Sequence, residues 1–264
     1  MGARVPGAHG RLSFASLGSG SKGNATLVSD GETHLLVDCG FTLREAERRL
    51  ARLGLHPRQL DAVLVTHEHG DHVRGIGPLA RRYGLPVHLT PGTWLSGRFG
   101  ELPRRHWITP QARFSVKGLT IDPVTVPHDA REPVQFCIAA CVRRLGLLTD
   151  LGHPSAHVIE AFAGCDALVL ECNHDPTMLA EGPYPASLKR RVGGNWGHLA
   201  NGQAAWLLQR LGLDRLQRIV CSHLSDQNNR PELALEALLP LLEGDESRLR
   251  VAAQDEGLAW QILG

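Results

Sequence analysis

The chain has 264 residues, of which 42% are hydrophobic and 21% charged, and its formal net charge is +1. This composition is typical of a soluble globular protein with a large core, and the charge balance permits a nucleic-acid substrate without demanding one. No apolar run approaches the ~20 residues of a membrane-spanning helix, so we expect no membrane contact. We predict a single domain over residues 1–264, in which residues 1–10 are a loose Gly-rich tail without a signal-peptide core.

The six cysteines form neither a redox motif nor a recognisable metal-binding pattern. None is part of a Cys-x-x-Cys pair, and most lie in apolar runs. We therefore predict reduced, buried thiols that act as small hydrophobic residues in a cytoplasmic protein. A structural zinc site built from them is a less favoured alternative. The six are Cys39, Cys137, Cys141, Cys165, Cys172 and Cys221.

The first part of the chain alternates short strands with turns before its helices. Strands are predicted from Arg11 to Leu17, Ala25 to Ser29, Thr33 to Asp38 and Ala62 to Thr66. The Gly-Ser-rich stretch 18–24 is a loop, and Asp30-Gly31 turns a hairpin. Amphipathic helices are predicted from Leu43 to Leu53 and from Val73 to Tyr83, the second ended by Gly84 and Pro86.

The remainder continues this mixture of strands and helices. Strands are predicted at Val87 to Leu89, Arg113 to Val116, Leu119 to Val126, Val134 to Ala140, Arg144 to Thr149, Ala167 to Leu170, Arg218 to Cys221, Leu249 to Ala252 and Ala259 to Ile262. Helices are predicted at Ser155 to Phe162, Ala186 to Val192, Ala200 to Leu211 and Leu233 to Leu242. Strand-rich blocks, each followed by helices, predict an α/β (α+β) fold of two sheets packed face to face with helices outside.

The stretch His67-Glu68-His69-Gly70-Asp71-His72 is the strongest chemical signal in the chain. It places three imidazoles and the Asp71 carboxylate directly after an apolar strand. Imidazole nitrogens suit zinc, manganese or iron, and a carboxylate adds charge and can serve as ligand or base. One such cluster can serve two ions about 3.5–4 Å apart. A loose metal-binding tract is the simpler alternative, but such tracts rarely follow a buried strand.

Three single polar residues follow other predicted strands and complete this set. His128 comes after Val126-Pro127, Asp150 ends the run Leu147-Leu148-Thr149, and His223 follows a strand that ends at Cys221. Each ion of a pair needs about three protein ligands and an open position. We therefore expect these side chains to join the histidine cluster in a cleft.

With these residues in order along nearly the whole chain, the sequence resembles the metallo-β-lactamase-fold superfamily. The resemblance implies a four-layer αββα sandwich with two divalent ions at the sheet edge. His67, His69 and His128 would hold one ion, Asp71, His72 and His223 would hold the other, and Asp150 would bridge them. Asp38 would lie behind them and hold the histidine cluster by hydrogen bonds.

Two further segments point within that superfamily to phosphodiesterases. Glu171 follows a predicted strand, and Gly197-His198 precedes a predicted helix. In phosphodiesterase branches of the superfamily, a His at the second position of the segment that corresponds to Gly197-His198 donates a proton, and an acidic residue orients that His. His198 with Glu171 resembles that dyad, although Gly197-His198 is also compatible with a plain turn into a helix.

The Gly-Ser loop, the histidine motif and the block Ser222 to Asn229 together resemble the YycJ-like bacterial exonuclease subgroup. This subgroup consists of small single-domain members associated with exonuclease activity on DNA 5′ ends. One departure is Ala200, where the resemblance leads us to expect Ser.

The activity expected from this resemblance is hydrolysis of phosphodiester bonds in nucleic acid, with DNA favoured over RNA. Asp71 would accept a proton from the attacking water, and His198 would protonate the leaving oxygen. The cofactors would be two divalent ions, Zn²⁺, Mn²⁺ or Fe. A tight turn without a ligand is the alternative for the Gly-Ser loop. Candidate substrate-binding residues are Ser19, Ser21, Asn24, Asn173 and Asn228.

Two other functions fit the same sequence less well. A carbonyl hydrolase, such as a thioesterase or lactonase, would use the same metals but has less need of a proton donor like His198. A non-catalytic nucleic-acid-binding module is disfavoured by the intact ligand set. The short interval between Asp150 and His223 leaves no room for the extra domain of larger ribonucleases. The oligomeric state is left open.

Overall fold

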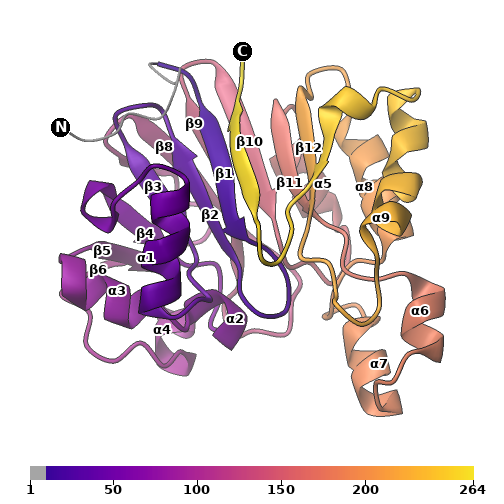
Figure 1. Ribbon diagram of the computed structural model, residues 1–264, viewed down its shortest axis with the longest axis horizontal. Coiled ribbons are helices and arrows are strands. Elements are labelled where there is room, and N and C mark those ends of the chain that lie inside the picture. Colours follow the sequence, from indigo (N-terminus) through magenta and orange to yellow (C-terminus); the bar gives the residue numbers. More distant parts are fainter. Residues whose placement is uncertain (1–9) are drawn as a thin grey trace.

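The computed structural model describes residues 10–264, so the predicted N-terminal tail lies almost entirely outside the described residues. Two seven-stranded sheets form its centre (Figure 1). The first has the order β14-β1-β2-β3-β4-β5-β6, from strands β14 Leu258–Ile262, β1 Ser13–Gly18, β2 Ala25–Ser29, β3 His34–Val37, β4 Ala62–Leu64, β5 Pro86–Leu89 and β6 Arg104–Trp107. The second has the order β13-β12-β11-β10-β9-β8-β7, from strands β13 Leu249–Val251, β12 Arg218–Ser222, β11 Ala167–Glu171, β10 Arg143–Leu148, β9 Val134–Ala140, β8 Leu119–Thr125 and β7 Phe114–Val116.

Helices cover the outer face of each sheet, which gives the four layers that the sequence predicts (Figure 1). On the first sheet these include α1 Leu43–Arg52 and α3 Ile76–Tyr83, with the short α2 Gly70–Val73 and α4 Pro91–Ser96 at its end. On the second they are α5 Ala156–Phe162, α8 Asn201–Leu211 and α9 Pro231–Leu238. The pair α6 Pro176–Glu181 and α7 Ala186–Val192 extends beyond the second sheet at the lower right of the view.

Alternating side chains in the strands explain why two sheets pack between two helical layers. In β3, Leu35 and Val37 enter the core between the sheets, whereas Leu36 packs under the helices of the first sheet. In β11, Val169 enters the same central core, and Leu170 faces the helices of the second sheet. Because successive side chains of a strand point to opposite faces, a strand that is apolar throughout must be covered on both sides.

The direction of the strands determines where polar side chains gather. Strands β3, β4 and β5 run parallel, as do β10, β11 and β12. Parallel neighbours end at the same edge, so residues that follow them are brought close together. The residues that follow these strands form the site described below.

Two predicted helices differ in the structure. The helix predicted from Val73 to Tyr83 is broken into α2 and α3 at Gly75, whose N–H bonds to Cys39 O at 2.8 Å. A Cβ at Gly75 would lie 2.1 Å from Phe41 O, so the chain turns there against the loop after β3. The helix predicted from Leu233 to Leu242 begins at Pro231 and becomes a 3₁₀ turn at Leu239–Leu242, because Pro240 has no N–H to continue it.

Several short elements were not predicted, namely α4, β6, α6 and the 3₁₀ turns Pro57–Gln59 and Glu246–Arg248. All four residues of β6 are exposed, so its sequence carries no apolar alternation. Five of the six cysteines are buried as predicted, and Cys141 is the exposed exception. Among the described residues, no helix combines the length and apolar character needed to span a bilayer.

Candidate metal centre and active site

The predicted ligands meet at one edge of the sandwich, although they are far apart in sequence. His67 and His69 lie in the loop after β4, and Asp71 and His72 lie in α2. His128, Asp150 and His223 come soon after the ends of β8, β10 and β12. Asp38 follows β3, so every residue of the set comes from the end of a strand or from the loop and helix that follow it.

Three histidines converge in the first group of ligands. His67 Nε2 lies 3.0 Å from His69 Nδ1, and His128 Nε2 lies 3.3 Å from the same atom. His128 Nδ1 donates to Gly197 O at 3.0 Å. The Nε2 atom of His128 is therefore unprotonated, and its lone pair faces the other two histidines. The sequence predicts this group, and the structure brings its members together.

The second group is formed by Asp71, His72 and His223, again as predicted. Asp71 Oδ2 lies 3.6 Å from His72 Nε2 and 3.4 Å from His223 Nε2. Asp150 lies between the two groups, with Oδ2 3.1 Å from His72 Nε2 and Oδ1 3.7 Å from His128 Nε2. This is the geometry expected of a bridging carboxylate.

Asp38 holds the histidine motif from behind. Its Oδ1 accepts from Thr66 N at 2.9 Å, and its Oδ2 accepts from Thr66 Oγ1 at 2.7 Å and from His72 Nδ1 at 2.8 Å. Because Thr66 Oγ1 donates to Asp38, it accepts from His67 Nδ1 at 2.9 Å, which leaves His67 Nε2 free to bind an ion. The buried Asp38 thus fixes the tautomers of two predicted ligands.

The site residues fit a pair of divalent cations. Within residues 10–264, Asp150 Oδ2 is buried without a hydrogen-bond partner, although it lies within ion-pair distance of His72 Nε2. Burial by itself lowers the pKa of His72, but Asp150, Asp71 and Asp38 outweigh it and hold that pKa well above its usual range. The pocket therefore favours positive charge at this position, which a bound cation supplies. Imidazole and carboxylate donors suit zinc, manganese and iron.

His198 and Glu171 form the predicted dyad. His198 Nδ1 lies 2.6 Å from Glu171 Oε1, and Glu171 is fully buried. Glu171 Oε2 accepts from Leu151 N at 2.9 Å and from Leu199 N at 3.1 Å, so the carboxylate is fixed in place. Burial alone lowers the pKa of His198, but the Glu171 carboxylate and its hydrogen bond raise it, and the net shift is upward.

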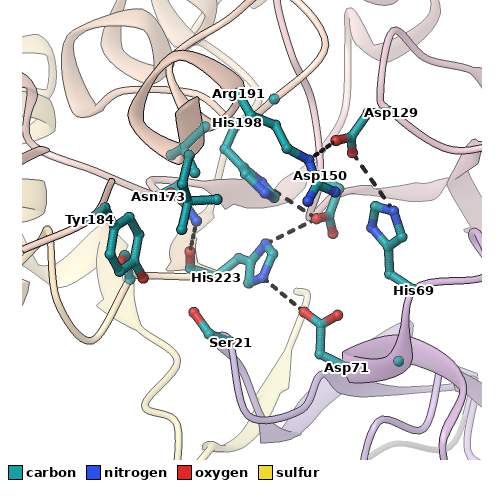
Figure 2. Close-up of a pocket in the computed structure, with 15 residues that line it drawn as sticks. Ser21, His69, Asp71, Asp129, Asp150, Asn173, Tyr184, Arg191, His198 and His223 are labelled. Carbon is teal, nitrogen blue, oxygen red and sulfur yellow. Dashed lines mark hydrogen bonds and ion pairs between the residues drawn. The ribbon is translucent and has the colours of Figure 1, made fainter. Parts of the chain in front are cut away.

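A cavity of about 350 Å³ opens over these residues (Figure 2). His69, Asp71, Asp150, His198 and His223 line it together. A small molecule in the cavity can therefore reach at least one member of each group and His198 of the dyad. Other residues of the lining that are labelled in Figure 2 are Ser21, Asp129, Asn173, Tyr184 and Arg191.

Of the predicted substrate-binding residues, Ser21 and Asn173 line the cavity, and the other three lie outside its lining. Ser19 Oγ accepts from His223 N at 2.8 Å and donates to Asn24 Oδ1 at 3.1 Å. Asn24 also joins the loop to α2, since its N–H donates to Asp71 O at 2.8 Å and its Nδ2 lies 3.1 Å from His72 Nε2. Asn228 is fully buried and bonds to Ser225 Oγ at 3.3 Å.

Asp129, Tyr184 and Arg191 are among the lining residues that sequence reasoning missed. Asp129 lies beside His128 in sequence, and its Oδ1 is 3.7 Å from His69 Nε2, so adjacency to a ligand was an available signal. Its Oδ2 also accepts from Arg191 Nε. Tyr184 and Arg191 lie before and within α7, where no motif marks them.

Comparisons with known proteins place this geometry in context. A family model described as "Beta-lactamase superfamily domain" matches residues 33–223. The exodeoxyribonuclease YycJ of Bacillus anthracis is 36% identical over 88% of this chain and 89% of its own length. The exodeoxyribonuclease WalJ of Streptococcus pneumoniae is 33% identical over 84% of each. The metallo-beta-lactamase fold protein YhfI from Bacillus subtilis superposes with a TM-score of 0.73 at 17% identity, over 95% of this chain and 99% of YhfI.

Proposed function

The chain belongs to the Beta-lactamase superfamily, in the branch of its YycJ and WalJ relatives, and on that premise we propose a two-metal phosphodiesterase that digests DNA from the 5′ end. It is a metal-dependent hydrolase. The names of both relatives support DNA as the substrate, and their match over most of the chain supports the same activity here.

The observation that carries the phosphodiesterase proposal is the His198–Glu171 dyad beside both ligand groups. Hydrolysis of a phosphodiester bond in a nucleic-acid strand expels a sugar alkoxide. An alkoxide is a poor leaving group, so it needs a proton as it departs. Glu171 engages Nδ1 of His198 at 2.6 Å, and His198 lines the cavity, so the other ring nitrogen is available to donate. The upward pKa shift keeps the ring protonated closer to neutral pH.

The remaining roles follow from the chemistry of the side chains. When bound, two divalent ions polarise the phosphoryl oxygens and lower the pKa of the attacking water. His67, His69 and His128 would hold one ion, Asp71, His72 and His223 the other, and Asp150 would bridge both. Asp71 faces the cavity and would accept the proton of the water.

Substrate would be positioned by the rest of the lining. Ser21 and Asn173 offer hydrogen bonds to the phosphate or sugar. The ring of Tyr184 offers a stacking surface for the terminal base, and Arg191 offers a guanidinium for a phosphate, with Asp129 holding that guanidinium in place.

The test is digestion of 5′- and 3′-labelled single- and double-stranded DNA and RNA by protein loaded with Mn²⁺ or Zn²⁺, alongside a panel of thioesters and lactones. We expect DNA to be shortened from its 5′ end and the esters to remain. Turnover of esters alone would overturn the proposal in favour of a carbonyl hydrolase. His157→Ala is a matched control for histidine variants, because His157 is exposed on α5 outside the cavity lining.

A further inference from the structure

A second cavity, of about 520 Å³, lies on the other side of α7 from the catalytic cavity. In Figure 1, α6 and α7 lie together below α8, and this cavity is lined by residues of all three helices. Arg191 of α7 faces the catalytic cavity, whereas Lys189 and Arg190 line the second one. None of its lining residues is shared with the catalytic cavity.

His174 is a buried polar side chain in this lining without a partner. It is 3% exposed, and among the described residues its ring atom Nδ1 is buried without a hydrogen-bond partner. Burial lowers its pKa, so the ring is neutral near pH 7 and carries one N–H donor. Unpaired buried polar groups are rare because they forfeit their hydration, so this one points to a ligand.

The first turn of α8 begins at this cavity, and within residues 10–264 two of its N–H donors are unpaired, one of them on the lining residue Gln203. Its N-cap residue, Ala200, has no side-chain acceptor, and Ala200 and Gln203 line the cavity. In the described part of the chain, the N–H groups of Gly202 and Gln203 have no acceptor. The first N–H groups of a helix, together with its dipole, attract anions.

The charged side chains that line the cavity have one sign, and the nearby carboxylates of Glu171 and Asp175 lie outside the lining. Lys189 and Arg190 line it, and no acidic residue is part of the lining. Lys189 Nζ is held by Ala180 O at 2.6 Å, and Arg190 makes no ion pair within residues 10–264. Gly193 keeps the approach to His174 open, since a Cβ there would lie 3.9 Å from His174 Nε2 and 3.3 Å from Leu179 Cδ2.

We propose that this cavity is a phosphate-binding site, in which His174, the first turn of α8 and the cations of α7 surround the anion. The phosphate belongs either to the nucleic-acid strand that reaches the catalytic cavity past α7 or to a free phosphate or nucleotide. Both sources share the chemistry that the site recognises. Anion binding here does not require the hydrolytic reaction proposed above, so either proposal can fail alone.

The direct test is titration of the full chain with inorganic phosphate, followed by NMR at the Gly202 and Gln203 amides and the His174 ring. These local signals separate binding here from binding at the metal centre. We expect saturable shifts at all three positions. No shift at millimolar phosphate would overturn the proposal. Shifts that grow without saturating would overturn it as well, because they indicate an adventitious ion only.

Two variants probe the site by different physical routes. Arg190→Gln removes a charge, and Gly193→Ala places a methyl group before His174 at a backbone φ of −85° that alanine adopts readily. We expect each to weaken phosphate binding about tenfold. Arg210→Gln removes an equal charge from the last turn of α8 and should leave binding unchanged. Equal affinity in wild type and both site variants would contradict the assignment, and unchanged spectra elsewhere establish that the variants are folded.

Competition identifies the source of the phosphate. A short single-stranded DNA that displaces phosphate from the Gly202 and Gln203 amides assigns the site to the nucleic-acid strand. Phosphate binding that DNA leaves undisturbed assigns it to a small anion. In the first case, Arg190→Gln also raises KM for long strands and leaves KM for bis-p-nitrophenyl phosphate unchanged.

Discussion

The chemistry proposed for this chain depends most on His198, whose ring contacts Glu171 and faces the cavity. His198→Ala should lower kcat/KM on DNA about 10²–10⁴-fold, the usual contribution of a general acid. The loss should be smaller on bis-p-nitrophenyl phosphate, because p-nitrophenolate leaves without a proton. Steady-state kinetics on both substrates checks this, with His157→Ala as the control. An equal loss on both would argue against proton donation.

Asp38 is not itself a candidate ligand, and it acts through its hydrogen bonds to His72 and Thr66. Asp38→Asn replaces one carboxylate oxygen by an amide and disturbs the bonds to His72 or Thr66. Asn tolerates the left-handed backbone that Asp38 adopts at φ 60°, so the fold should persist. We expect metal affinity to fall about 10–100-fold, measured by competition with a chelator. Unchanged affinity would show that Asp38 does not orient the ligands.

At the scale of elements, the loop after β3 must pass very close to α2. A Cβ on Gly40 would lie 1.8 Å from Asp71 O, whereas a Cβ on Gly70 meets nothing within 4 Å. Gly40→Ala should therefore displace α2, lower the free energy of unfolding by about 1–3 kcal/mol and weaken metal binding.

Gly70→Ala is the matched comparison, because Gly70 is the first residue of α2, two positions from His72. It should keep both stability and metal affinity close to those of the wild type. Chemical denaturation and metal titration of the two variants decide the point. Equal effects of the two substitutions would refute the close-approach explanation.

Helix α1 is attached to the rest of the molecule through Glu45 and Arg49. Arg49 is buried, donates to Leu17 O and Gln254 O at 2.8 Å, and pairs with Glu45 at 2.6 Å. Hydrogen bonds from Arg48, and further ones from Arg49, lower the pKa of Glu45 to about 2 from an ordinary 4.5. A lowered carboxyl pKa stabilises the fold above pH 4.5, and this stabilisation is lost as pH falls from 4.5 towards 2.

Glu45→Gln should thus lower the free energy of unfolding by about 0.3–1 kcal/mol at pH 7. The value is modest because solvent screens the partly exposed ion pair. The difference from the wild type should shrink as the pH falls through that window. Urea denaturation at several pH values measures it, with Glu160→Gln on α5 as a control at an exposed position. A difference that stays constant down to pH 2 would contradict the ion-pair explanation.

For the whole molecule, the sequence predicted most of the architecture and the residues that cluster as candidate metal ligands. Strand-rich blocks, each followed by helices, predicted two central sheets with outer helices. Fully buried strands such as β11 are accordingly covered on both faces. The candidate ligands could be recognised because several are polar residues just after such a strand, as His128 and Asp150 are, and the others belong to the histidine motif.

Other features have no local signal and could not be predicted. Tyr184 and Arg191 reach the cavity only because α7 packs over it, which depends on long-range contacts. The break at Gly75 depends on Phe41, which is distant in sequence. The roles of Ser19 and Asn24 as internal supports likewise follow from their bonds to His223 and Asp71, which no spacing reveals.

The most direct test of this account is an anomalous difference map from crystals of the protein grown with Mn²⁺ or Zn²⁺. We expect two peaks about 3.5–4 Å apart, one among His67, His69 and His128 and the other among Asp71, His72 and His223, with Asp150 between them. A map with no peak, or with a single peak at saturating metal, would contradict the paired centre on which the proposed activity depends.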